Sequence, residues 1–406
     1  MHPVPQGRQS HQGHLAFLAL ALLAAGCGGH ARRPAISVTP RVSLSTAPVD
    51  IRVTGLKPHE AATITVTSTD ADGRVFTSHQ TYNADGHGVV HAGATTIAAM
   101  TPASGDPFYA WSRSRTKFGV VATQGRTRLT TTFMREQEPV STTNKSLTVA
   151  RDGFFGFYAA PRRDAKRPAL LVFGGSEGGL TTDTLAASLA ARGYPALAIA
   201  YFKEPGLPSK LENIPLEYFV RAIRWLDRQP QVSRHHVFVL GISRGSEAAQ
   251  LLGVHFPGLV DGVVASVPSD YVGGCYVAPP GRCSGPAWTL DGRPIAFAGI
   301  FRAPPGIVEL AADRIPDEHI RGPILFACAG LDFTWPSCDY SRDAMKHLTR
   351  DRYEHRLLEA HDAGHFVGAL VPDDPGGAVG YLGAKADERG RERVWPALLA
   401  FLARNG

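Results

Sequence analysis

Solid apolar runs alternate with amphipathic segments over the C-terminal two thirds of the chain. The runs lie at 169–173, 196–200, 236–240, 262–267 and 324–327. They lack polar alternation, as is typical of strands that are buried on both faces of a parallel sheet. Segments with helical spacing fall between them, such as 215–229, where Tyr218, Ile223 and Leu226 share a face. This alternation predicts an α/β domain over residues 147–406.

The segment before this region has a different pattern. At 49–53 and 62–66, Val or Ile alternates with polar residues between turns rich in Gly, Pro, Asp and Asn. Short strands at this spacing predict a β-sandwich of immunoglobulin type over residues 35–132. The polar stretch 133–146 is predicted to be the linker between the two domains. A chain of 406 residues is long enough for at least two domains.

Residues 1–27 have the organisation of an export signal. The apolar run at 15–26 is too short to span a bilayer but has the length of a signal-peptide core. The sequence LLAAGC at 22–27 resembles a bacterial lipobox, in which Cys27 is lipidated and becomes the mature N-terminus. We expect either a lipoprotein anchored on the outer side of the cytoplasmic membrane or a secreted protein with a plain cleaved signal. Both interpretations export the chain.

The chain has five cysteines, and lipidation of Cys27 leaves an even number in an environment that permits disulfides. Four cysteines allow three pairings. The local pairs, Cys275 with Cys283 and Cys328 with Cys338, are favoured because each closes a short loop. Four free buried thiols are the alternative. No pair has the spacing of a zinc site, and we predict no metal.

The pattern G-x-S-x-G at 241–245 follows a predicted strand and precedes a predicted helix at 246–254. Small residues around a serine allow a sharp strand-to-helix turn from which the side chain projects. The pattern also occurs by chance, so its structural context decides its meaning. Here the context is right, and we predict that Ser243 is a nucleophile.

A second match, GGSEG at 174–178, competes with the first. It follows an early strand, where hydrolases with such an elbow place a loop that donates an N–H to the oxyanion, whereas Ser243 lies two strand-helix units later. We therefore predict that the backbone N–H groups of Ser176 and Arg244 form an oxyanion hole. The loop lacks the Lys and Ser/Thr of a phosphate-binding loop, so no nucleotide cofactor is predicted.

An elbow serine requires a carboxylate and then a histidine later in the chain. Asp332 follows the strand at 324–327 and is placed at the carboxyl edge of the predicted sheet, and His365 lies in a loop of small residues. We predict that His365 accepts the Ser243 proton and that Asp332 orients the imidazole and stabilises its protonated form. The rivals are His361 as base and Asp362, Asp373 and Asp374 as acids.

The motifs in this order resemble a known family, the acyl-CoA thioesterases and bile acid-CoA:amino acid N-acyltransferases. The matching stretches include FGGSEGG at 173–179, GISRGSE at 241–247, LDFTWPS at 331–337 and AGH at 363–365. The resemblance implies an N-terminal β-sandwich joined to a C-terminal α/β-hydrolase fold, and it places the same triad at Ser243, Asp332 and His365. The amidating members use Cys as nucleophile. This chain has Ser at that position, and in this respect it is similar to the hydrolytic members.

The resemblance implies a serine hydrolase that cleaves a small-molecule acyl thioester through an acyl-enzyme. Acyl-CoA-cleaving members work inside cells, whereas this N-terminus predicts export to a compartment where acyl-CoA is scarce. An exported carboxylesterase or acyltransferase acting on lipid esters is therefore an alternative, as is a non-catalytic surface lipoprotein. The 42 basic and 36 acidic residues include no basic run interleaved with aromatics, so nucleic acid is not an expected partner.

For three features near the motifs, the sequence allows two interpretations each. Glu247 either bonds within the floor of the site or faces solvent, and Trp335 either lines the pocket or packs under the acid loop. The stretch 269–322 resembles an insertion that shapes the acyl pocket, with a loop that makes no contact with the site as the alternative.

Overall fold

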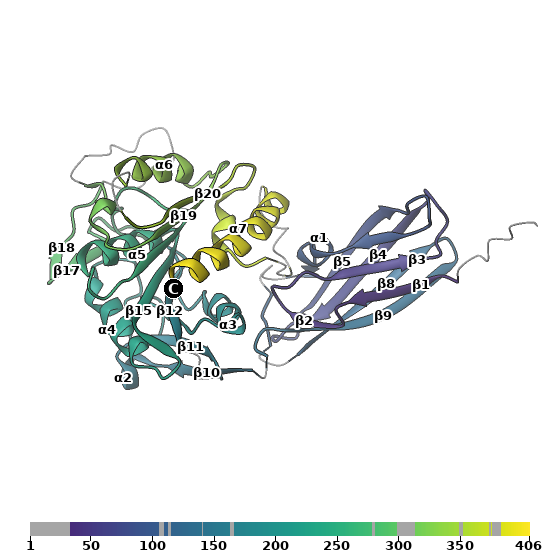
Figure 1. The fold of residues 1–406 in the computed structure, drawn as a ribbon, viewed down its shortest axis with the longest axis horizontal. Helices are drawn as coiled ribbons and strands as arrows, with labels where there is room; N and C mark the ends of the chain where they lie inside the picture. Colours follow the sequence, from purple (N-terminus) through teal and green to yellow (C-terminus); the bar gives the residue numbers. More distant parts are fainter. Residues whose placement is uncertain are drawn as a thin grey trace, which may run out of the picture.

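The computed structural model describes residues 33–104, 109–112, 115–139, 141–162, 166–277, 281–298, 313–348, 352–372, 375 and 383–406. They form a β-sandwich and an α/β domain that lie end to end along the long axis of the molecule (Figure 1). The predicted signal segment 1–27, with Cys27, lies outside the described residues. Within the described part of the chain, no helix is both long and apolar enough to cross a membrane.

The N-terminal body consists of two sheets. The smaller sheet contains β1 (Ala35–Thr39), β3 (Asp50–Thr54) and β6 (Val90–Ala92). The larger has the order β2 (Val42–Leu44), β9 (Thr127–Glu136), β8 (Thr116–Gln124), β4 (Ala61–Thr69), β5 (Val75–Asn83) and β7 (Thr101–Pro102). Alternate side chains of the strands meet in one core, which includes Ile51, Val53, Ile64, Val66 and Phe118.

The structure moves the boundaries predicted for the sandwich and the linker. Strand β9 continues to Glu136 instead of ending at 132, and β10 (Thr142–Leu147) already belongs to the α/β sheet. The predicted linker 133–146 therefore shrinks to the few residues between these strands. The stretch is polar in sequence, but the fully buried Arg135 guanidinium donates to the carbonyl oxygens of Leu44, Ser45 and Ala47.

The α/β domain is built on an eight-stranded sheet of order β10-β11-β13-β12-β15-β16-β19-β20. The first two pairings are antiparallel and the others are parallel. The remaining strands are β11 (Phe155–Pro161), β12 (Arg167–Phe173), β13 (Ala196–Ala200), β15 (Val232–Ile242), β16 (Gly262–Ser266), β19 (Ile324–Ala329) and β20 (His355–Ala360). All five predicted runs lie within or almost entirely within these strands.

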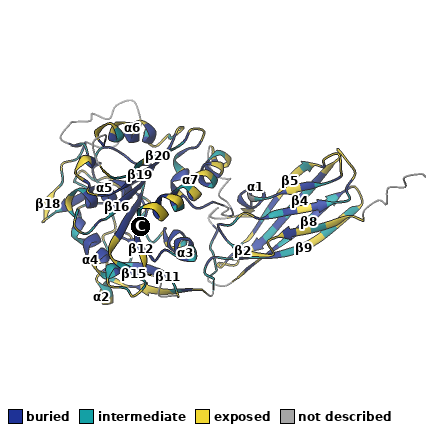
Figure 2. Ribbon diagram, in the orientation of Figure 1, coloured by how far each residue is buried: buried dark blue, intermediate teal, exposed yellow. Residues whose placement is uncertain are grey.

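Helices cover both faces of this sheet, which explains the apolar character of its strands. Helices α4 (Leu216–Asp227), α5 (Arg244–His255) and α6 (Ser337–His347) pack on one face. Helices α3 (Asp183–Ala191) and α7 (Ala384–Asn405) pack on the other. In β12, Leu171 and Phe173 face the first layer, and Leu170 and Val172 face the second. Figure 2 shows the buried sheet between the two layers.

Short elements complete the described chain. They are α1 (Ala94–Ala98), α2 (Val149–Asp152), the 3-10 helices η2 (Asp317–His319) and η3 (His365–Ala369), and a small sheet of β14 (Ile214–Pro215), β17 (Trp288–Leu290) and β18 (Arg293–Pro294). The sandwich meets the α/β domain on the side of α3, where Gln137 Nε2 donates to the Thr184 carbonyl and Arg192 donates to Thr46.

Candidate active site

Ser243 occupies a strained turn between β15 and α5. Its φ of 56° and ψ of −123° lie outside the regions that L-residues normally adopt. A side chain in this conformation projects from the carboxyl end of the sheet, because the chain reverses into the helix at this point. The Ser243 N–H donates to the Ser266 carbonyl on β16 at 2.9 Å, which fixes the turn to the neighbouring strand.

The glycines on either side of Ser243 are required by close packing. A Cβ on Gly241 would lie 2.1 Å from the Gly245 carbonyl oxygen. A Cβ on Gly245 would lie 2.3 Å from the carbonyl oxygen of Gly174. Both contacts are with backbone atoms, so no side-chain rotation relieves them. The G-x-S-x-G pattern at 241–245 therefore reflects the geometry of this turn.

The structure brings Ser243, His365 and Asp332 together in one chain of hydrogen bonds. His365 Nε2 lies 2.9 Å from Ser243 Oγ, and His365 Nδ1 lies 2.9 Å from each oxygen of Asp332. The Asp332 side chain is 1% exposed and that of His365 is 16% exposed, so the acid is shielded while the imidazole reaches the surface. This arrangement can accept a proton from the serine and stabilise the imidazolium that forms.

Two of the rivals, His361 and Asp362, lie within the described residues and form other contacts. The side chain of His361 is 78% exposed and faces Glu359 at 3.3 Å. Asp362 forms surface ion pairs with Arg389 and Arg393. Asp373 and Asp374 lie outside the described residues.

The loop that carries Asp332 is closed at its base. Cys328 on β19 forms a disulfide with Cys338 on α6, with the two Cα atoms 4.9 Å apart. Within the loop, Asp332 Oδ1 also accepts from the Thr334 N–H at 2.9 Å. Trp335 is buried, donates from Nε1 to the Val267 carbonyl and lies edge-on to the His365 ring. Trp335 therefore packs under the acid loop and against the base.

The glycine-rich segment 174–178 lies directly against the serine. A Cβ on Gly175 would be 2.8 Å from Ser243 Cβ. The Gly175 N–H donates to Glu177 Oε1 at 2.9 Å, so this N–H is directed at its own loop. Arg244 begins helix α5, and the N–H groups of a first helical turn have no acceptor within the helix. The role of the Ser176 and Arg244 N–H groups as donors to an oxyanion stays a prediction.

Helix α5 contains a buried ion pair, and both members of the pair form hydrogen bonds with the insertion. Arg244 Nε lies 2.7 Å from Glu247 Oε1, and both side chains are almost completely buried. The Arg244 guanidinium also donates to the carbonyls of Gly273 and Gly274 at 2.9 and 2.8 Å. Glu247 Oε2 accepts from Trp288 Nε1 at 3.0 Å. Glu247 therefore belongs to the interior, and the insertion contacts the elbow helix.

The insertion carries the second disulfide. Cys275 pairs with Cys283, with their Cα atoms 6.0 Å apart, beside the glycine carbonyls that Arg244 holds. Both disulfides are the local pairs favoured from the sequence, so the four cysteines are not free thiols.

Sequence reasoning missed two residues that hold the site. Asp387 on α7 is almost fully buried and accepts the N–H of Gly364, the residue before His365. Tyr201, just after β13, donates to the carbonyls of Gly174 and Gly175. Each residue acts through a loop that is distant in sequence, and neither lies in a motif, so no local pattern indicated them.

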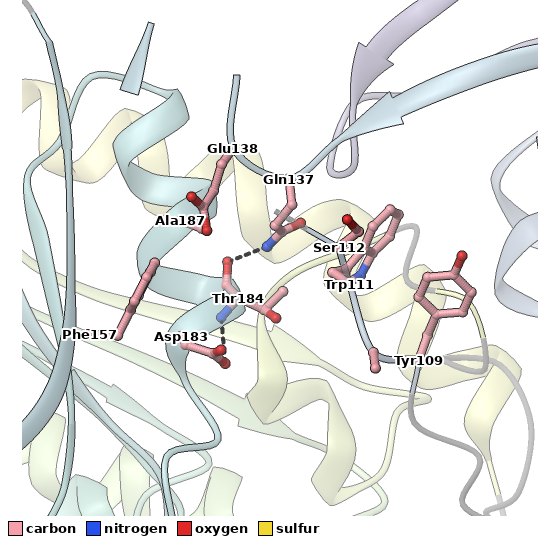
Figure 3. Close-up of a pocket in the computed structure, with 10 residues that line it drawn as sticks. Tyr109, Trp111, Ser112, Gln137, Glu138, Phe157, Asp183, Thr184 and Ala187 are labelled. Atoms are coloured by element: carbon pink, nitrogen blue, oxygen red, sulfur yellow. Dashed lines mark hydrogen bonds between the residues drawn. The ribbon is translucent and has the colours of Figure 1, made fainter. Parts of the chain in front are cut away.

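A cavity of about 230 Å³ lies away from these residues, between the two bodies (Figure 3). It is lined on one side by Tyr109, Trp111 and Ser112 and on the other by residues of α3, with Gln137 and Glu138 between them. Neither Ser243, Asp332 nor His365 lines it. In the described part of the chain, no cluster of His, Cys, Asp and Glu side chains is placed to hold a metal ion.

The sheet order, the turn after β15 and the serine, histidine and aspartate at the carboxyl edge define an α/β-hydrolase fold. Comparison with known proteins gives the family. Residues 214–372 match the family described as BAAT / Acyl-CoA thioester hydrolase C terminal, and residues 46–97 match the Acyl-CoA thioester hydrolase/BAAT N-terminal region. The chain belongs to this acyl-CoA thioesterase/BAAT family and is a thioester or ester hydrolase.

Individual relatives cover both parts of the chain. The peroxisomal succinyl-coenzyme A thioesterase of Mus musculus is 26% identical over 79% of this chain and 82% of its own length. The mitochondrial acyl-coenzyme A thioesterase 2 of Homo sapiens is 26% identical over 79% of this chain and 71% of its own. Among solved structures, an esterase from Pyrobaculum calidifontis is 18% identical with a TM-score of 0.42, covering 66% of this chain and 87% of its own.

Proposed function

We propose that the chain is a serine hydrolase that cleaves acyl thioesters through a covalent acyl-enzyme on Ser243. The observation that carries this proposal is the continuous hydrogen-bonded chain from Ser243 through His365 to Asp332. A serine hydroxyl alone is a weak nucleophile, and a neighbouring base of this kind is what activates it.

The reaction has two halves. Ser243 Oγ attacks the acyl carbonyl carbon while its proton moves to His365 Nε2, and the carbonyl electron pair moves to the oxygen. The N–H groups of Arg244 and Ser176 stabilise this oxyanion, each by about 3 to 4 kcal/mol. When the tetrahedral intermediate collapses, the thiol leaves with the proton from His365. Water then attacks the acyl-enzyme with His365 as base and releases the acid.

Exposed apolar side chains around the site support an acyl substrate. Leu331 and Phe333, on either side of Asp332, are 53% and 68% exposed, and Phe366, beside His365, is 42% exposed. Exposed large apolar side chains that gather at one place mark interaction sites. At the mouth of this site they offer contact to an acyl chain.

Partitioning to hydroxylamine tests the acyl-enzyme. A thioester and an ester with the same acyl group should give the same ratio of hydroxamate to free acid, because both pass through one acyl-enzyme. A ratio that depends on the leaving group would show that water attacks the substrate directly and would overturn the proposal. Ser243→Ala serves as the control and should form neither product above background.

Export and anchoring through Cys27 are a second part of the proposal. Two disulfides within the described residues are the observation that supports export, because disulfides are rare in reducing compartments. Mass spectrometry of the mature protein should find a diacylated Cys27 at its N-terminus. A mature protein that begins at another residue, without lipid, would show that a secretory signal is cleaved and that the protein is not anchored through Cys27. A protein that still begins at residue 1 would overturn export.

Export also favours an alternative in which esters, rather than acyl-CoA, are the physiological substrates. In a related alternative, the enzyme is an acyltransferase that passes the acyl group to an acceptor other than water. The distinguishing measurement is kcat/KM for acyl-CoA and for p-nitrophenyl and lipid esters of equal chain length. A clear preference for the lipid ester favours the carboxylesterase, and a preference for acyl-CoA favours the thioesterase. If the wild-type protein hydrolyses none of these substrates, the result favours a non-catalytic lipoprotein.

A further inference from the structure

Tyr201 lies beneath the glycine-rich loop and outside every motif. It is 4% exposed, and its hydroxyl lies 2.9 Å from the Gly174 carbonyl oxygen and 3.0 Å from that of Gly175. We propose that Tyr201 is a positioning residue that orients the peptide between Gly175 and Ser176 so that the Ser176 N–H faces the oxyanion. This inference rests on the proposed function of Ser243.

The geometry of the peptide between Gly175 and Ser176 determines where its N–H points. In a trans peptide, the carbonyl of one residue and the N–H of the next point in opposite directions. A hydrogen bond that holds the Gly175 carbonyl on Tyr201 therefore turns the Ser176 N–H away from Tyr201. Because Gly175 packs against Ser243, with a hypothetical Cβ 2.8 Å from Ser243 Cβ, this peptide lies beside the attacking hydroxyl.

Neighbouring contacts restrict the loop to this orientation. The Gly175 N–H donates to Glu177 Oε1, and the same oxygen accepts from Thr181 Oγ1 at 2.8 Å. The preceding N–H is thereby committed within the loop, and the Ser176 N–H is left as the loop's donor to the substrate. A flipped peptide at this point would present a carbonyl oxygen to the developing negative charge.

The surroundings of Tyr201 keep it a hydrogen-bond donor. Burial raises its pKa well above 10.0, the charges of Glu177 and Glu247 raise it further, and Arg244 opposes them. Its ring lies against Phe219 and Trp288, with ring centres 5.3 and 5.6 Å away, so the hydroxyl has a fixed position. Without that hydroxyl, the buried carbonyls of Gly174 and Gly175 lose their donor, which costs free energy unless the loop rearranges.

Inhibitor binding to Tyr201→Phe tests the proposal. An alkyl trifluoromethyl ketone forms a bond from Ser243 Oγ to its carbonyl carbon, and the carbonyl oxygen becomes an oxyanion as the proton moves to His365. The matching methyl ketone binds without forming this bond. In Tyr201→Phe, we expect kcat/KM to fall about 10- to 100-fold and the trifluoromethyl ketone Ki to rise by the same factor. The Ki of the methyl ketone should not change.

Tyr218→Phe is the matched control. Tyr218 is also almost fully buried, donates to the carbonyl of Ala200 and accepts from the Phe155 N–H, and both of these partners lie outside the glycine-rich loop. A general effect of losing a buried tyrosine hydroxyl would appear in both variants as a lower unfolding free energy. Only Tyr201→Phe should change the ratio of the two inhibition constants.

Each outcome decides the question. Equal changes in both ketones, or wild-type affinity for the trifluoromethyl ketone, would overturn the role of Tyr201. If Tyr201→Phe does not fold, 4-aminophenylalanine at position 201 retains a donor and should restore the wild-type ratio of Ki values; failure to do so would also overturn it. If wild-type protein does not bind the trifluoromethyl ketone more tightly than the methyl ketone, it is the proposed function that fails.

Discussion

The chain contains the same five-residue pattern twice, and the two copies have different structures. At 241–245, the serine occupies the strained turn between β15 and α5, is 8% exposed and lies 2.9 Å from His365 Nε2. At 174–178, the chain runs from β12 into a loop, and Ser176 is only half-buried. Among the glycines of this second copy, Gly178 needs its φ of +68°.

The glycines, rather than the serine, distinguish the two copies. In the elbow they allow strand and helix to meet at van der Waals distance. In the loop, Gly175 allows the backbone to approach Ser243, and the Gly174 carbonyl oxygen is the atom that excludes a side chain at Gly245. The two copies are packed on each other.

Removing each serine hydroxyl gives the largest expected contrast. Ser243→Ala should lower kcat by about 10⁴- to 10⁶-fold, because no other group can form the acyl-enzyme. Ser176→Ala keeps the backbone N–H that the mechanism uses and should change kcat less than about threefold. Steady-state hydrolysis of an ester substrate measures both. Comparable losses in the two variants would mean that the Ser176 side chain takes part in the reaction.

The ion pair under the elbow gives the next largest effect. Glu247→Gln leaves the buried Arg244 guanidinium without a counter-charge and should lower the unfolding free energy by about 3 to 5 kcal/mol. Glu177→Gln, in the loop copy, changes an exposed carboxylate and should lower it far less. Urea unfolding of both variants makes the comparison. Equal losses of unfolding free energy in the two variants would contradict the view that a buried ion pair stabilises the elbow and that no such pair stabilises the loop copy.

The contact between the two copies is tested by a single methyl group. Gly245→Ala places a Cβ 2.3 Å from the Gly174 carbonyl oxygen and should destabilise the protein by about 1 to 3 kcal/mol. Gly258→Ala is the control, since nothing lies within 4 Å of its Cβ. The melting temperature and the rate of ester hydrolysis should both fall in Gly245→Ala and stay unchanged in Gly258→Ala. Equal behaviour of the two variants would show that the copies are not in close contact.

A third active-site loop gives the smallest effect, which depends on pH. Asp387 accepts the Gly364 N–H as Glu177 accepts that of Gly175, but it is buried. Burial raises the pKa of Asp387 above 3.8, the charge of Asp332 adds to this, and the Gly364 hydrogen bond, Arg391 and His365 oppose it. A pKa that is higher in the folded state means that this group lowers stability as pH rises through the folded-state pKa.

Asp387→Asn keeps an oxygen for the Gly364 N–H and removes the buried charge. Its unfolding free energy should exceed that of wild type at about pH 8, and the difference should shrink towards about pH 4. Urea unfolding across this range measures the difference. A difference that is independent of pH, or that grows as pH falls, would contradict the assignment of a raised pKa.

The sequence predicts the α/β sheet and the elbow because both depend on local pattern. Apolar runs mark strands covered on both faces, and chain order distinguishes Ser243 from Ser176. The sandwich extends past the predicted boundary at 132 to Glu136, because Arg135 resembles a surface residue in the sequence and is buried only by the carbonyls that the fold brings around it. Tyr201 and Asp387 were missed for the same reason, since their partners are backbone groups brought near only by the fold.

The position of a covalent label identifies the nucleophile. A fluorophosphonate probe reacts with an activated serine, and trypsin separates the two candidates, with Ser243 in the peptide 235–244 and Ser176 in the peptide 167–192. Mass spectrometry of the labelled protein should find the adduct only on Ser243. An adduct on Ser176, or no adduct on active enzyme, would contradict the assignment of the nucleophile.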